Sequence, residues 1–195
     1  MALERLDASE QLPDDGILFI GSSSVRRWST IEQDMKPWRA IRRGYGGARF
    51  TDLATFAKRL VANHDYQALV IFVANDIAGR DSDRTPAEVL ELFKYTVDQV
   101  RSIHPSQPIF YIEITPTSSR FAAWDKISQS NQLIREQCES DAKLHFIQTA
   151  RAFMNASGRP DDALFVKDRL HLNDDGYQLW AKIIKMRLEG ALGKP

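Results

Sequence analysis

The chain has little cysteine, no net charge and no long apolar stretch, and each shortage excludes a class of protein. Its single cysteine, Cys138, rules out an internal disulfide and is compatible with a reducing compartment. Lysine and arginine together number 26, as do aspartate and glutamate, so the formal net charge is zero. Binding to nucleic-acid phosphates requires a clustered excess of positive charge, and we therefore expect no nucleic-acid partner.

No apolar run approaches the roughly 20 residues that a membrane-spanning helix needs. The first ten residues carry acidic side chains where a signal peptide would have a basic end and an apolar core. We therefore expect a cytoplasmic protein without stable membrane insertion, although a chain from which a leader had been removed would look the same. The sequence alone leaves the oligomeric state open.

The length of 195 residues suits one domain with a sizeable core, and the hydrophobic fraction of 43% is that of an ordinary globular protein. The sequence contains no internal repeat, no low-complexity stretch and no convincing linker. We predict a single domain over residues 1–195, in which residues 1–15 form a lead segment before the first strand.

Short apolar runs alternate with amphipathic segments along the chain. The runs, which we predict to be strands, are residues 16–20, about 38–41, 68–73, 108–114 and 144–147. Helical patterns cover residues 50–61, 85–103, about 119–138 and about 174–192. This alternation predicts an α/β fold, with a mainly parallel sheet between two layers of helices. In such sheets ligands bind outside the carboxyl ends of the strands.

Two segments at opposite ends of the chain carry the residue types of nucleophilic catalysis. Ser22, Ser23 and Ser24 follow the first apolar run, where a hydroxyl would lie at the sheet edge beside free backbone N–H groups. Asp168 stands three residues before His171 in a loop that opens the last helix, so its carboxylate can hold the imidazole. A serine, its base and the acid that orients the base are the three side chains that nucleophilic catalysis by a serine requires.

Each segment taken alone also has an ordinary structural explanation. Serine is a preferred helix cap, and histidine–aspartate pairs are common on surfaces. The glycines of residues 44–47 and Asn75 could be turn formers, or they could aim N–H groups at one reacting oxygen. A metal site is disfavoured, because no second histidine or cysteine stands at ligand spacing from His171.

Together these segments resemble the SGNH hydrolases, the superfamily of GDSL-like esterases and lipases. The matching blocks are Phe-Ile-Gly-Ser-Ser-Ser at residues 19–24, then residues 43–47, 75–78 and 168–173. Their order and spacing agree over about residues 16–190, and the serines before Val-Arg-Arg-Trp are similar to a bacterial subgroup of GDSL-type esterases. The resemblance implies a three-layer α/β/α fold with a five-stranded parallel sheet of flavodoxin-like order, and neither a metal nor an organic cofactor.

The resemblance also implies a role for each matching residue. Ser23 would be the nucleophile, His171 its base and Asp168 the acid that orients the base. The oxyanion hole would consist of the backbone N–H groups of Ser23 and Gly47 and the side-chain amide of Asn75.

Two further residues are candidates for substrate binding. Ser22 stands where the family has an aspartate next to the nucleophile. Arg120 lies in the loop after the fourth predicted strand, where it could contact a polar or anionic part of a substrate, or could be a solvated arginine at a helix start. We expect the nearby Trp124 to belong to the core.

The chain departs from the family at two positions. Val73 stands where the family has glycine, two residues before Asn75, and its isopropyl group could narrow the site or shift Asn75. Arg42 replaces an asparagine before the second block. Both departures bear on substrate size and efficiency more than on the fold.

These observations predict a serine esterase that hydrolyses a small-molecule carboxylic ester through an acyl-enzyme. No apolar lid is visible, which favours short acyl groups, and acetylesterase, thioesterase and lysophospholipase-like activities all stay open. One alternative is a flavodoxin-like module that binds phosphate at the serine loop, but it gives no role to Asp168, His171 or Asn75. Another is an SGNH fold that has lost turnover.

Overall fold

Five short apolar segments pair as the strands of one parallel sheet. The computed structural model describes residue 10 and residues 12–195. The strands are β1 (Gly16–Gly21), β2 (Ala40–Gly44), β3 (Tyr66–Phe72), β4 (Ile109–Ile112) and β5 (Leu144–Ile147), in the order β2-β1-β3-β4-β5. This is the flavodoxin-like order, so the predicted fold is confirmed.

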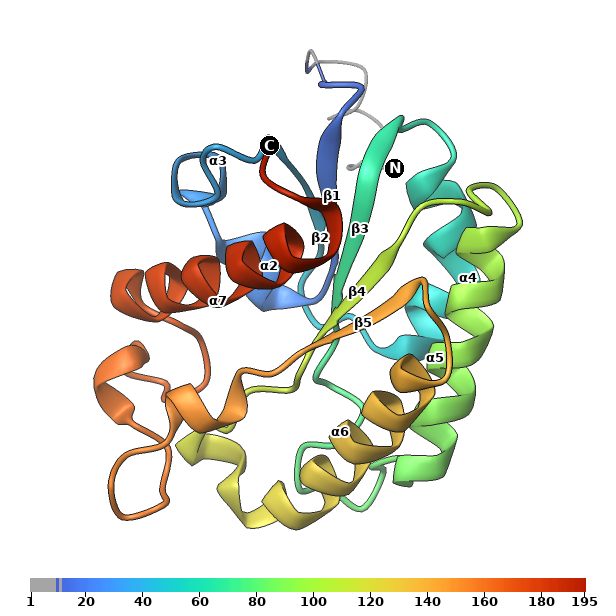
Figure 1. Cartoon of the computed structure of the whole chain (residues 1–195). Coiled ribbons are helices and arrows are strands. Elements are labelled where there is room, and N and C mark those ends of the chain that lie inside the picture. The colour runs from blue at the N-terminus through green and yellow to red at the C-terminus, as the bar shows by residue number, and fades with distance from the viewer. Residues whose placement is uncertain (1–9, 11) are drawn as a thin grey trace.

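Helices cover both faces of the sheet (Figure 1). On one face lie α4 (Phe50–Val61), α5 (Pro86–Arg101) and α6 (Trp124–Glu139), and on the other lie α2 (Ser23–Arg27), α3 (Ile31–Asp34) and α7 (Asp174–Leu192). Three short 3-10 turns join the later elements: η1 (Ser118–Ala123), η2 (Ala150–Phe153) and η3 (Asp162–Leu164).

Two helix starts follow directly from their sequences. Thr85 caps α5, because its hydroxyl accepts a hydrogen bond from the Glu88 N–H at 3.2 Å while the Glu88 carboxylate accepts one from the Thr85 N–H at 2.7 Å. Asn173 caps α7 by accepting from the Gly176 N–H at 3.0 Å. One predicted start was wrong: the helix expected from about residue 119 begins with η1, and α6 itself starts only at Trp124.

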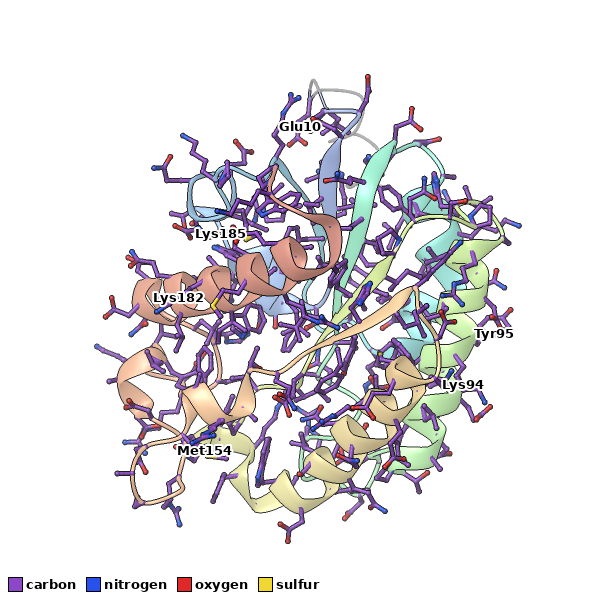
Figure 2. All side chains as sticks on the ribbon, viewed as in Figure 1. Glu10, Lys94, Tyr95, Met154, Lys182 and Lys185 are labelled. Atoms are coloured by element: carbon purple, nitrogen blue, oxygen red, sulfur yellow. The ribbon has the colours of Figure 1, made fainter. Side chains whose placement is uncertain are left out.

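The core is continuous across the sheet, and β1 is buried along its whole length. On the α7 side, the Trp28 ring stacks on Tyr177 with centroids 5.3 Å apart, which ties the short α2 region to the last helix. The opposite layer turns its outer surface to solvent, where Lys94 and Tyr95 project from α5 (Figure 2). Trp124 is half-buried and packs against the core.

The single cysteine lies in this core. Cys138 is buried on α6, and burial raises the pKa of its thiol to about 12, which is typical of a structural thiol and not of a reactive one. Within residue 10 and residues 12–195, no helix is both long enough and apolar enough to cross a membrane.

Candidate active site

The serine loop leaves the carboxyl end of β1 through a glycine that no other residue could replace without strain. Gly21 has φ 140°, and a Cβ atom there would lie 1.9 Å from the Phe72 carbonyl oxygen. The next residue, Ser22, donates its backbone N–H to that same oxygen at 2.9 Å. This close contact between β1 and β3 places Ser23 as the first residue of α2, at the edge of the sheet.

The Asp168–His171 loop is held by the carboxylate of Asp168. One oxygen of that carboxylate accepts the backbone N–H groups of Leu170 and His171, both at 2.9 Å. Arg169, which stands between Asp168 and Leu170, has φ 52°, a left-handed conformation that is uncommon for a residue with a side chain. The turn is tight enough to bring the second Asp168 oxygen onto the His171 ring.

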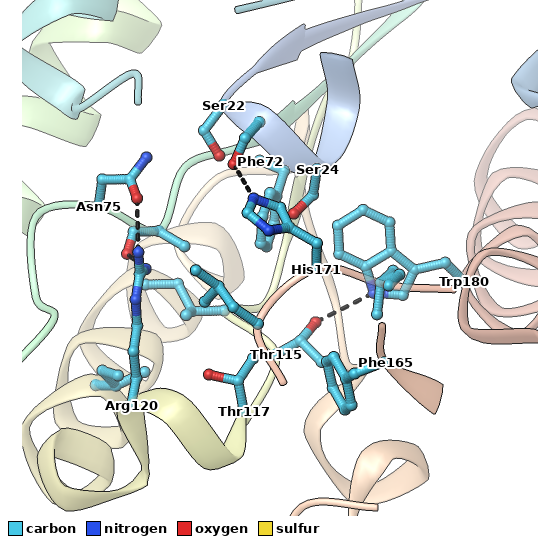
Figure 3. Close-up of a pocket in the computed structure, with 16 residues that line it drawn as sticks. Ser22, Ser24, Phe72, Asn75, Thr115, Thr117, Arg120, Phe165, His171 and Trp180 are labelled. Atoms are coloured by element: carbon cyan, nitrogen blue, oxygen red, sulfur yellow. Dashed lines mark hydrogen bonds between the residues drawn. The ribbon is translucent and has the colours of Figure 1, made fainter. Parts of the chain in front are cut away.

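Ser23, His171 and Asp168 form one chain of hydrogen bonds, and Figure 3 shows the His171 ring of this chain beside the serine loop. The Ser23 Oγ lies 2.9 Å from His171 Nε2, and His171 Nδ1 lies 2.6 Å from Asp168 Oδ2. Desolvation favours the neutral form of Asp168, but hydrogen bonds from the His171 N–H, the His171 ring and the Leu170 N–H outweigh it and lower the pKa of Asp168 to about 2. The carboxylate is therefore charged where it meets the imidazole.

The three groups assigned to the oxyanion hole lie at the mouth of the same site. Gly47 has φ 75°, in the turn that follows β2. Asn75 donates its Nδ2 to the Ala48 carbonyl oxygen at 2.8 Å, and its Oδ1 accepts from Arg120 at 2.8 Å. Among the described residues, the N–H groups of Ser23 and Gly47 donate to no other backbone group, so both are free to bind a ligand.

Two cavities meet at Ser23 and His171. The inner cavity encloses about 30 Å³, roughly the space of two or three water molecules, and its apolar wall includes Phe72, Ile114 and Trp180. The outer cavity is much larger, about 450 Å³, and opens past Gly47 and the arginines of α2. Asn75 lines both cavities.

The candidate substrate-binding residues both line the inner cavity. Ser22 is buried in its wall. Arg120 extends along it toward Asn75 (Figure 3) and also donates to the Ala74 carbonyl oxygen. Burial lowers the pKa of the Arg120 guanidinium, and the nearby Arg80 lowers it further. Their contact with a substrate stays a prediction.

The two departures from the family pattern lie outside the inner cavity. Val73 is fully buried and does not line it, and its carbonyl oxygen faces the Tyr111 hydroxyl at 3.5 Å. Arg42 is half-buried on β2, and its guanidinium donates to the Arg26 carbonyl oxygen.

Sequence reasoning missed two residues of the site. Arg26 and Arg27 line the outer cavity, yet in the sequence they are only a short break in an even charge distribution. Their spacing from Ser23 could have identified them. They stand three and four residues after Ser23 on one helix, so they lie on the same face of that helix as Ser23, one turn further on.

A hydroxyl, an imidazole and a carboxylate in one hydrogen-bonded chain, at the carboxyl edge of a parallel sheet, are the parts of a hydrolase on a flavodoxin-like scaffold. Residues 19–179 match the model of the GDSL-like lipase/acylhydrolase family, and the chain belongs to that family. It is therefore a hydrolase that acts on ester bonds, on a flavodoxin-like fold. A search of the curated proteins finds no match.

Solved structures share this fold at low sequence identity. A GDSL-like lipase from Bacteroides thetaiotaomicron superposes with a TM-score of 0.82 at 18% identity, over 98% of this chain and 97% of that one. An acetylxylan esterase from Geobacillus stearothermophilus, a catalytic mutant, gives 0.72 at 15% identity over 91% and 95%. A carbohydrate esterase family 3 protein from Talaromyces cellulolyticus gives 0.68 at 16% identity over 90% and 97%.

The described residues offer no obvious metal centre. Among them, no group of three or more histidine, cysteine, aspartate or glutamate side chains is arranged to hold a metal ion.

Proposed function

We propose that the protein hydrolyses carboxylic esters with short acyl groups through an acyl-enzyme formed on Ser23. The observation that carries this proposal is the chain from Ser23 Oγ through His171 to the Asp168 carboxylate, with distances of 2.9 Å and 2.6 Å. Both lie within the hydrogen-bond range that nucleophilic catalysis requires.

The reaction runs in two halves. In the first, His171 Nε2 takes the Ser23 proton while Oγ bonds to the ester carbonyl carbon, and the resulting imidazolium then protonates the leaving alcohol as the carbon–oxygen bond breaks. In the second, His171 removes a proton from the water that attacks the acyl-enzyme carbonyl carbon. The imidazolium then returns that proton to Ser23 Oγ as the bond between Oγ and the acyl carbon breaks, which releases the carboxylic acid and free Ser23. Asp168 holds the imidazole by its Nδ1 side and stabilises its charged form.

The negative oxygen of each tetrahedral intermediate needs donors fixed in advance. The free N–H groups of Ser23 and Gly47 and the second N–H of the Asn75 amide are the candidates. Asn75 is suited to this role because both of its amide atoms are already anchored, by Ala48 and by Arg120.

Cavity size supports a short acyl group. The carbonyl carbon bonded to Ser23 must direct one substituent into each of the two cavities that meet there. The inner cavity of about 30 Å³ suits an acetyl-sized group, whereas the outer one, at about 450 Å³, suits a larger alcohol.

A fluorophosphonate probe read by intact mass tests the nucleophile. The wild type should gain one adduct, and Ser23→Ala should gain none. Ser22→Ala and Ser24→Ala are matched controls, since each removes a neighbouring hydroxyl from the same loop, and both should still be labelled.

Two results would contradict the proposal. Labelling of Ser23→Ala would assign the nucleophile to another residue. A folded wild type that is neither labelled nor active on acetyl, butyryl and thioacetyl esters would favour a fold without turnover.

A further inference from the structure

The outer cavity has an excess of positive charge that the hydrolytic mechanism does not use. Arg26 and Arg27 line it, beside Ser23, Gly47 and His171, and no aspartate or glutamate does. Since the chain as a whole has 26 basic and 26 acidic residues, this is a local departure from an even balance.

Neither arginine is neutralised by a neighbour. Among residue 10 and residues 12–195, no carboxylate forms an ion pair with Arg26 or Arg27. Asp168 is the acid of the adjoining loop, and it is already bound to His171 at 2.6 Å. A third cation lies close by, because Arg42 donates to the Arg26 carbonyl oxygen.

The geometry of α2 directs these side chains at the reaction centre. Side chains of a helix lean toward its N-terminus, and here the N-terminal residue is Ser23. The Arg26 guanidinium reaches the glycine turn after β2, where a Cβ atom added to Gly46 would lie 2.9 Å from its Nη1. That turn is the one that carries Gly47.

We propose that the outer cavity binds the alcohol portion of an anionic ester, with Arg26 and Arg27 pairing to a carboxylate or phosphate on that alcohol. This inference rests on the proposed function, because it takes the inner cavity as the acyl site and so leaves the outer cavity to the leaving group. The preferred substrate class is then short-chain acyl esters of acidic alcohols. Arginine suits this role because its planar guanidinium binds both anions with paired N–H groups.

The test compares acetyl esters that differ only in charge on the alcohol. The probes are 4-acetoxybenzoate, 4-acetoxyphenyl phosphate and the neutral methyl 4-acetoxybenzoate. For each one, kcat/KM is measured on the wild type and on the Arg26→Gln/Arg27→Gln double variant, so that the intrinsic reactivity of each ester cancels. Arg39→Gln is the control, since this exposed arginine precedes β2 at the opposite edge of the sheet.

The double variant should lose roughly three- to tenfold in kcat/KM on the anionic esters, as expected for two solvent-exposed ion pairs, and little on the neutral ester. Raising the salt concentration should reduce the wild-type preference, because salt screens exposed charges. Whichever of the two anionic esters shows the larger loss of kcat/KM in the double variant indicates whether the site prefers a carboxylate or a phosphate. Equal losses on charged and neutral esters would overturn the proposal, and so would an equal loss in Arg39→Gln.

A binding measurement keeps this proposal separate from the hydrolytic one. The probe 4-acetamidobenzoate replaces the ester oxygen with an N–H that resists hydrolysis, and its Kd can be measured by calorimetry on Ser23→Ala. The anion site predicts a Kd that is roughly three- to tenfold weaker when both arginines are changed to glutamine. Unchanged affinity would refute the anion site whether or not the protein turns over esters.

Discussion

Whether Asn75 can serve in the oxyanion hole depends on which way round its carboxamide lies. Arg120 can only donate hydrogen bonds, and the Ala48 carbonyl can only accept them. Both contacts therefore require Oδ1 on the Arg120 side and Nδ2 on the Ala48 side. This orientation leaves the second Nδ2 hydrogen for a substrate oxygen, and the Arg120 charge makes it a stronger donor.

Removing the Asn75 amide should abolish most of the turnover while the protein still folds. We expect Asn75→Ala to reduce kcat by about 10²–10³, the usual effect of losing one oxyanion donor. The variant should stay folded but melt at a somewhat lower temperature, because the change leaves the buried Ala48 carbonyl oxygen without its Asn75 donor. Full activity in this variant would exclude Asn75 from the oxyanion hole.

Arg120 should act through Asn75, which a double-mutant cycle can detect. We expect Arg120→Met to lower kcat about tenfold, since it removes a charge-assisted hydrogen bond from the amide, and Arg120→Lys to restore part of the loss. In the Asn75→Ala background the same change should have little further effect on kcat. If the loss of kcat in the double variant instead equals the product of the two single losses, Arg120 acts independently of Asn75, as it would by contacting the substrate itself.

The Asp168 carboxylate should contribute to stability in a defined pH range. Its pKa is about 2 in the folded protein against an ordinary 3.8. Folding thus favours the ionised form, so the contribution is complete above pH 3.8 and is lost as the pH falls from there toward 2.

The difference in unfolding free energy between wild type and Asp168→Asn should therefore shrink as the pH is lowered through this range. Urea denaturation at a series of pH values measures it. Asp98→Asn, which changes an exposed carboxylate on α5, should show no such trend. A difference that stays constant with pH would mean that folding does not lower the pKa of Asp168.

At the scale of elements, α7 holds α2, the helix that begins with Ser23, in place. The Tyr177 hydroxyl donates to the Ser24 carbonyl oxygen at 2.9 Å inside the protein, and its ring stacks on Trp28. Burial raises the pKa of Tyr177 to about 12, so the phenol stays protonated and able to donate. The packing of α7 thereby fixes the turn that carries Ser23.

Tyr177→Phe tests this contact, because it removes the hydroxyl and keeps the ring. We expect a loss of about 1–2 kcal/mol in unfolding free energy, since the Ser24 carbonyl is left buried without its donor. The matched change Tyr95→Phe, at a side chain that is 52% exposed, should lie within about 0.5 kcal/mol of the wild type. Equal losses of unfolding free energy in the two variants would mean that the hydrogen bond from Tyr177 to Ser24 does not stabilise the protein.

At the scale of the whole molecule, one sheet and one continuous core imply one cooperative unit. The cluster of buried residues runs from β1 through all five strands to α7. We therefore expect unfolding in urea to give a single transition that coincides when followed by tryptophan fluorescence and by far-ultraviolet circular dichroism. Separate transitions would divide the chain into more than one unit and overturn the single domain predicted from its length.

Much of the fold could be read from the sequence, because the signals involved are local. The apolar run of β1 and the capping box of Thr85 and Glu88 identify a buried strand and a helix start from neighbouring residues alone. The 3-10 turn before α6 was missed, because residues 118–123 are compatible with either kind of helix and their tertiary contacts decide between them.

The sequence by itself determined the α/β class, the approximate positions of the strands and of the four long helices, and the local Asp168–His171 pair, because periodicity, caps and short spacings act between neighbours in the chain. It did not predict the bounds of the short helices α2 and α3. Only the tertiary structure decided the contact of His171 with Ser23, 148 residues apart, the orientation of Asn75 by Arg120, and the placing of Arg26 and Arg27 at the cavity mouth. These depend on the strand order, which brings the carboxyl ends of β1, β2 and β3 together, and no local pattern encodes that proximity.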